Sequence, residues 1–196
     1  MWAAERRSWL ARNPPPHTPI QEREHDEQFT AKIDAWLDQG AGSCALRDLA
    51  TRECVTASLL NFDGTRYEHH AWIVMPNHVH LLFSPLAAHS IESLVRGWKG
   101  VSARHANQLR HHRDEFWMRD YYDRLVRDAE HFWRCARYIR RNPEKAKLPT
   151  DSCTLYEAPF VRDFLDAEAG LQRIGGTPAA VPAAQTERRQ ECRRSV

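Results

Sequence analysis

The sequence predicts an α+β domain, and three observations lead to this prediction. Apolar stretches at 66–75 and 78–84 are joined by Pro76 and Asn77, which is typical of two strands connected in a hairpin. On both sides of this hairpin, apolar residues recur at helical spacing. No apolar run reaches the roughly 18–20 residues that a membrane-spanning helix needs.

Two helices are expected before the hairpin. Residues 13–19 read NPPPHTP and cannot continue a helix, because each proline lacks a backbone donor and fixes φ. Residues 24–40 then carry apolar side chains at helical spacing and end at a glycine. Residues 46–62 repeat this pattern, and Asp63 with Gly64 forms a turn signal before the first strand.

Two further helices and a strand are expected after the hairpin. Ser90 is a suitable N-cap for a long helix that runs to about His111. The aromatic and β-branched stretch 116–126 favours a strand. Asp128 caps another helix, which is expected to end near Asn142, immediately before a proline.

Composition restricts the function only weakly. The 28 Lys and Arg residues against 26 Asp and Glu give a net charge of +2, so the overall charge does not indicate a polyanion partner. Basic residues nevertheless cluster along two predicted helices and are candidate DNA contacts: Arg96, Lys99, Arg104, Arg134 and Arg141. The five scattered cysteines include no CxxC pair, which favours reduced thiols and a cytoplasmic protein.

His78 and His80 are candidate metal ligands. Residues i and i+2 of a strand share a face, so both imidazoles can offer nitrogen to one cation. The pattern alone is more typical of a polar strand face with solvated histidines. On the last predicted helix, Tyr138 and Asn142 are neighbours at i and i+4, and Arg134 and Arg141 lie on roughly the same side. A phenol is a usable nucleophile, and an amide oxygen is a suitable ligand for Mg²⁺ or Mn²⁺.

Taken together, four stretches resemble the REP-associated tyrosine transposases, within the single-tyrosine HUH (IS200-like) transposase family. They are FDGTRYEHHAWIVMPNHVHLLFSPL (62–86), SIESLVRGWKGVSARHAN (90–107), FWMRDYYDRLVRD (116–128) and ARYIRRNPEKAKL (136–148). They occur in the family's order and with family-like spacing. The resemblance implies a ferredoxin-like (RRM-like) antiparallel sheet with helices on one face and a C-terminal tyrosine-bearing helix.

The resemblance also implies a function. His78, His80 and Asn142 are expected to hold one Mg²⁺ or Mn²⁺, and Tyr138 is expected to attack single-stranded or hairpin DNA. The implied product is a 5′-phosphotyrosine link with a free 3′-OH, which a second strand can attack in DNA transposition. A homodimer is expected. The alternative is a catalytically inactive or domesticated sequence-specific DNA-binding protein descended from such a transposase.

Two other classes of enzyme share parts of this pattern. A histidine-triad nucleotide hydrolase needs a further histidine near position 82, which is Leu82. An RNA-processing metal enzyme would share the basic face, and the sequence leaves it open.

The predicted domain organisation has four parts. Residues 1–27 form a basic, proline-rich segment, and 28–148 form the HUH nuclease domain. Residues 149–169 form a C-terminal extension, and 170–196 form a disordered tail because of their polar, glycine-containing and proline-containing composition. Relatives open with an apolar strand that lies centrally in the sheet, and no such strand is visible before the proline-rich stretch.

Overall fold

The structure, a computed structural model, describes residues 2–14, 16–86, 88–119, 121–173 and 190–195. These residues divide into two compact units, 1–44 and 45–196. The division falls after Cys44, whereas the sequence suggested that the nuclease domain starts at residue 28. Each unit is described by itself.

The first unit is helical. Its helices are α1 (Trp2–Arg12), α2 (Pro19–His25) and α3 (Ala31–Asp38), and a short π-helical stretch (Asp26–Thr30) links the last two. The rings of Trp9, His25 and Phe29 are buried together, with the Trp9 and His25 centroids 5.0 Å apart. No strand occurs among the described residues of this unit.

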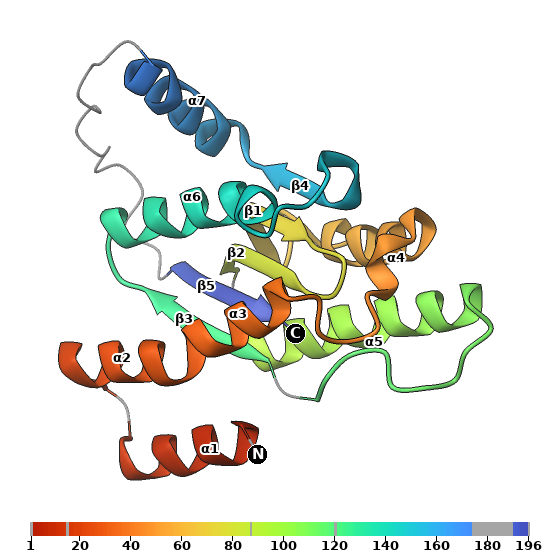
Figure 1. Ribbon diagram of the computed structural model, residues 1–196, viewed down its shortest axis with the longest axis horizontal. Helices are drawn as coiled ribbons and strands as arrows, with labels where there is room; N and C mark the ends of the chain where they lie inside the picture. Colours follow the sequence, from red (N-terminus) through yellow and green to blue (C-terminus); the bar gives the residue numbers. More distant parts are fainter. Residues whose placement is uncertain (1, 15, 87, 120, 174–189, 196) are drawn as a thin grey trace. The chain divides into compact units, whose positions relative to one another are not determined.

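The second unit contains a five-stranded sheet and four α-helices in its described part (Figure 1). In chain order its elements are α4 (Leu49–Leu60), β1 (Tyr67–Val74), β2 (Val79–Pro85), α5 (Ile91–Leu109), β3 (Tyr122–Val126), α6 (Ala129–Lys145), β4 (Thr154–Glu157), α7 (Pro159–Arg173) and β5 (Gln190–Ser195). The strand order is β3-β5-β2-β1-β4, and every neighbouring pair is antiparallel. The expected α+β class is confirmed.

The β1–β2 hairpin forms as its residues predict. Val74 pairs with Val79, and Ile73 pairs with His80. Because side chains alternate along a strand, Val79, Leu81 and Phe83 pack on one face, and His80 and Leu82 lie on the other. The hairpin therefore presents the histidines to the layer opposite its main apolar core.

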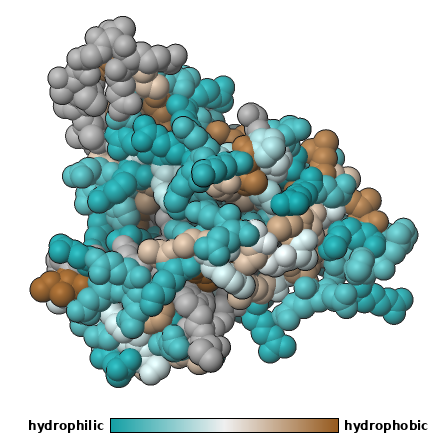
Figure 2. Space-filling model, viewed as in Figure 1, coloured by the Kyte–Doolittle hydropathy of each residue, from teal (hydrophilic) through white to brown (hydrophobic). Residues whose placement is uncertain are grey.

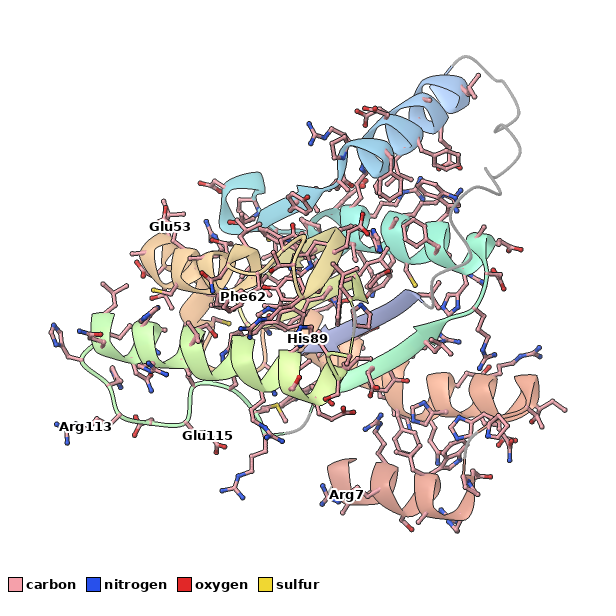
Figure 3. All side chains as sticks on the ribbon, turned by 180° about the vertical axis from the view of Figure 1, so that it is seen from behind. Arg7, Glu53, Phe62, His89, Arg113 and Glu115 are labelled. Atoms are coloured by element: carbon pink, nitrogen blue, oxygen red, sulfur yellow. The ribbon has the colours of Figure 1, made fainter. Side chains whose placement is uncertain are left out.

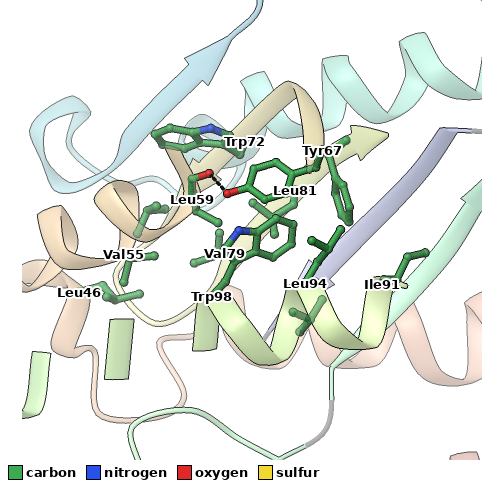
Figure 4. Close-up of a cluster of buried hydrophobic side chains, with 13 residues drawn as sticks. Leu46, Val55, Leu59, Tyr67, Trp72, Val79, Leu81, Ile91, Leu94 and Trp98 are labelled. Atoms are coloured by element: carbon green, nitrogen blue, oxygen red, sulfur yellow. Dashed lines mark hydrogen bonds between the residues drawn. The ribbon is translucent and has the colours of Figure 1, made fainter. Parts of the chain in front are cut away.

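Helices α4 and α5 cover the first face of the sheet. Val55, Leu59, Leu94 and Trp98 from these helices meet the strand residues in a buried cluster (Figure 4). Within it the Tyr67 hydroxyl donates a hydrogen bond of 2.7 Å to the Leu59 carbonyl oxygen. The Ser90 side chain accepts a hydrogen bond from the Ser93 N–H, and the Asp128 side chain accepts one from the His131 N–H, which confirms both predicted N-caps.

Helix α6 packs on the second face, where the histidines lie. Phe132, Ala136 and Ile139 contact strand residues such as Ile73 and Leu82. Two arginines also tie α6 to the elements that follow it, because Arg140 pairs with Glu157 and Asp166, and Arg137 pairs with Glu168. The helix is thus held in place by packing and by charge-assisted hydrogen bonds.

Two sequence predictions need correction. Helix α6 does not end near Asn142 but continues through Pro143 to Lys145. The missing proline donor costs one hydrogen bond, and the helix is closed by Ala146 donating to the Asn142 carbonyl. The predicted disordered tail from Gly170 is also wrong in part, because α7 extends to Arg173 and residues 190–195 form β5; residues 174–189 lie outside the described residues.

Strand β5 occupies a central place in the sheet, between β2 and β3. Its Leu82↔Cys192 and Arg124↔Cys192 pairings link it to both neighbours. It therefore satisfies the backbone donors and acceptors along one side of the histidine-bearing strand. The C-terminal segment takes a central position that the sequence left without a strand.

The face of the molecule drawn in Figure 2 is mostly polar. Hydrophilic residues predominate on it, and hydrophobic ones emerge in small groups. Among the described residues, no helix combines the length and the apolar character needed to cross a membrane.

Candidate active site

His78 and His80 converge at the start of β2. Their Nε2 atoms are 2.9 Å apart, and each side chain is only 2% exposed. Two ligand atoms on adjacent corners of an octahedron with bonds of about 2.1 Å would be about 3 Å apart. The spacing of the two nitrogens therefore fits shared coordination of one cation, and it equally permits a hydrogen bond between the two rings.

Asn77 favours one tautomer of His78. Its Oδ1 lies 2.8 Å from His78 Nδ1, so that oxygen can accept a hydrogen bond from a protonated Nδ1. A neutral imidazole with its proton on Nδ1 carries a lone pair on Nε2, the nitrogen that faces His80. The sequence indicated Asn77 only as a turn residue, and its role beside the pair was missed.

Helix α6 brings Tyr138 to the histidines. The Tyr138 and His80 rings are 5.3 Å apart between centroids and nearly perpendicular. This contact joins the predicted nucleophile to a predicted metal ligand across 58 residues of chain. It follows from the packing of α6 on the face of the sheet that carries His80.

Asn142 lies one turn after Tyr138 on the same helix. Its side chain is fully buried, and neither of its amide atoms has a hydrogen-bond partner among the described residues. A buried amide without partners is costly, about 1–3 kcal/mol by mutational measures. A ligand for its oxygen would remove part of this cost, so the residue fits the expected third donor. No group of three His, Cys, Asp or Glu in the described part of the chain is arranged to hold a metal.

Lys145 is a cation near the tyrosine that the sequence analysis missed. Its Nζ lies 5.5 Å from the centroid of the Tyr138 ring. The residue lies beyond Pro143, where the helix was expected to have ended. Tyr138 and Lys145 are seven residues apart, which is about two helical turns and places both on the same side of a helix. The sequence predicts their proximity only if the helix continues through Pro143.

The basic residues predicted to contact DNA lie on two helices that cover opposite faces of the sheet. Arg134 and Arg141 are exposed on α6. Arg96, Lys99 and Arg104 belong to α5, which packs on the opposite face of the sheet from His80. The structure therefore does not bring these three α5 residues to the histidine pair.

Two neighbouring tyrosines are rivals to Tyr138. Tyr122 is buried in β3, and Tyr121 is partly buried beside the first core cluster. Tyr122 and His80 both pair with Arg194 in register, and directly paired residues share a face of the sheet. Tyr122 thus lies on the histidine face too, two strands from His80, while Tyr138 makes the ring contact.

The buried histidines of β1 are separate from this site. His70 Nε2 lies 2.8 Å from the Ser84 hydroxyl. Burial is the larger cause, and the charge of the neighbouring His69 the smaller one, that lowers the pKa of His70 to about 4. Burial likewise lowers the pKa of His69, whose Nε2 faces the Leu59 carbonyl at 3.0 Å. Both are neutral, structural histidines at pH 7.

Comparison with known families agrees with this geometry. Residues 61–142 match the family model described as "Transposase IS200 like". This segment is similar to the IS200-like transposase family.

The segment that matches the IS200-like family runs from the end of α4 through Asn142 and includes His78, His80 and Tyr138. This similarity supports a transposase-like function. Comparisons with curated proteins and with solved structures give no match.

Proposed function

We propose that the protein is a metal-dependent strand transferase that cleaves single-stranded or hairpin DNA through a covalent tyrosine intermediate. The observation that carries the proposal is the meeting of Tyr138 with the His78–His80 pair, inside a segment similar to the IS200-like transposase family. His78, His80 and Asn142 are the proposed ligands of a single Mg²⁺ or Mn²⁺. The bound cation would neutralise charge that develops on the phosphate.

Tyr138 is the proposed nucleophile. Its phenolic oxygen bonds to phosphorus and loses its proton, the P–O3′ bond breaks, and the departing 3′-oxygen gains a proton. The products are a 5′-phosphotyrosine and a free 3′-OH. Since the phosphodiester energy is kept in the tyrosine link, the 3′-OH of another strand can reverse the step and join to the 5′ end.

The surrounding residues support these roles. The Lys145 cation lies 5.5 Å from the centroid of the Tyr138 ring and would add positive charge near the attacked phosphate. Asn77 holds His78 with its Nε2 available, and neutral histidine ligands leave the site positive toward a phosphate. A homodimer acting in the cytoplasm completes the proposal.

The test is metal-dependent cleavage of labelled hairpin and single-stranded oligonucleotides. His80→Ala is expected to abolish cleavage and to weaken Mn²⁺ binding in calorimetry, while most DNA affinity persists because phosphate contacts dominate it. The matched control is His89→Ala, which removes an exposed histidine between β2 and α5 (Figure 3). Thermal melting shows whether each variant is folded.

Two results would count against the proposal. Cleavage by folded His80→Ala at the wild-type rate would remove the histidine pair from the reaction. Tight, salt-dependent DNA binding by a wild type that cuts no oligonucleotide would favour the non-catalytic DNA-binding descendant instead.

A further inference from the structure

A groove of about 560 Å³ runs between α5 and the segment that returns from it toward β3. Figure 3 labels Glu115 on this returning segment. The volume is in the range of sites for small organic ligands. The lining of the groove includes Arg96, Lys99, Gly100 and Asn107 of α5 on one side, and residues 114–119 with Tyr121 on the other.

The returning segment is fixed to α5 by side-chain hydrogen bonds. Lys99 Nζ donates to the Met118 carbonyl at 2.6 Å, and Asn107 Nδ2 donates to the Asp114 carbonyl at 2.8 Å. Trp117 Nε1 donates to the Ser102 hydroxyl at 2.9 Å. Three anchors along the segment give the groove a defined wall, which is a property of a binding site rather than of a loose loop.

The chemistry of the lining suits a heterocycle. Phe116, Trp117 and Tyr121 supply aromatic rings, and the Phe116 and Trp117 centroids are 4.9 Å apart. The charged lining residues balance, because three are basic and three are acidic: Arg96, Lys99 and Arg119, against Glu92, Asp114 and Glu115. A bare phosphate chain would meet three carboxylates, whereas a nucleobase offers a face for stacking and edges that both donate and accept hydrogen bonds.

We propose that this groove binds an unpaired nucleobase of the substrate DNA and so contributes to substrate choice. The inference rests on the proposed function, since it takes single-stranded or hairpin DNA as the ligand. The groove lies with α5, on the opposite side of the sheet from His80. It is therefore a recognition site apart from the tyrosine and the metal ligands.

Gly100 allows the groove to be filled without disturbing the fold. A Cβ at Gly100 would meet no atom within 4 Å, and the same holds for Gly97, one turn earlier. Both glycines are exposed in the middle of α5, but only Gly100 lines the groove. Since leucine is a better helix former than glycine, Gly100→Leu and Gly97→Leu are both expected to fold.

The experiment measures DNA binding in the Tyr138→Phe background, so that its outcome does not depend on cleavage. Fluorescence anisotropy compares a labelled single-stranded oligonucleotide of mixed sequence with an abasic oligonucleotide of the same length. Gly100→Leu is expected to weaken binding of the mixed-sequence strand on the order of tenfold, the loss of about one stacked base. Binding of the abasic strand is expected to be unchanged, and Gly97→Leu should behave as its parent with both strands.

Equal affinities of Gly100→Leu and Gly97→Leu for the mixed-sequence strand would overturn the inference, and so would an equal loss for the abasic strand. The covalent-adduct assay with unmutated Tyr138 tests the proposed function independently. Absence of an adduct together with a selective effect of Gly100→Leu would refute the strand-transfer chemistry and support the groove. An adduct together with no effect of Gly100→Leu would support the strand-transfer chemistry and refute the groove as a base-binding site.

Discussion

Acidification is expected to destabilise the protein through the buried His70. This side chain is 3% exposed on β1, its Nε2 lies 2.8 Å from the Ser84 hydroxyl, and the Phe132 and Phe160 rings lie against it. An imidazolium here would lose its hydration without gaining an anionic partner. Burial, and to a smaller extent the charge of the nearby His69, accordingly lowers the pKa of His70 from its ordinary 6.5 to about 4.

The size and sign of the effect follow from this difference. The folded pKa lies below the unfolded one, so the unfolded chain binds the proton first. The stabilisation is complete above pH 6.5 and is lost as the pH falls from 6.5 toward 4. At about 1.4 kcal/mol for each unit of pKa, protonation of His70 lowers the free energy of unfolding by about 3 kcal/mol once the pH has fallen to about 4. His69, whose pKa is lowered mainly by burial, adds to the loss in the same direction.

Urea unfolding followed by circular dichroism between pH 7 and pH 4.5 measures this dependence. His70→Gln keeps a hydrogen-bonding group near Ser84 and removes the titration, so its stability should fall with pH less steeply than that of wild type. His89→Ala, which lacks only an exposed histidine, should keep the wild-type slope. Identical slopes for wild type and His70→Gln would refute the reasoning.

Three further predictions follow from the packing around the sheet. Arg52→Met should lower the free energy of unfolding by about 3 kcal/mol in urea titrations, because Arg52 is buried and donates to the Thr154 hydroxyl and to the Asp151 and Ser152 carbonyls; a loss below about 0.5 kcal/mol would contradict this. Deleting residues 190–196 should lower the melting temperature by several degrees and speed hydrogen exchange in β2, since β5 covers one side of that strand; unchanged exchange would contradict it. Lys145→Met should slow adduct formation without weakening Mn²⁺ binding, because it removes a cation that lies 5.5 Å from the centroid of the Tyr138 ring; adduct formation at the wild-type rate would contradict it.

The local parts of this fold are readable from the sequence. The hairpin follows from alternating apolar residues around Pro76 and Asn77, and the starts of α5 and α6 follow from Ser90 and Asp128. Each of these signals acts within a few residues, so neighbouring sequence suffices. The convergence of His78 with His80 has the same origin, because it requires only the two-residue period of a strand.

The rest depends on contacts between distant segments. The residues of β5 are mostly polar and resemble a tail, and their strand conformation comes from pairing with β2 and β3 rather than from their own preference. Lys145 was missed because Pro143 is a helix breaker in most contexts, whereas α6 continues through it. The groove along α5 depends on three hydrogen bonds that span 7 to 19 residues, and no short motif encodes them.

The most direct test of the account is the identity of the nucleophile. With Mn²⁺ and a labelled hairpin oligonucleotide, wild type should form a protein–DNA adduct that survives denaturing gel electrophoresis. Tyr138→Phe removes only the hydroxyl, so the account predicts a folded protein that binds the hairpin and forms no adduct. Tyr121→Phe and Tyr122→Phe should both retain the adduct. An adduct that persists in Tyr138→Phe and disappears in Tyr122→Phe or Tyr121→Phe would contradict the assignment.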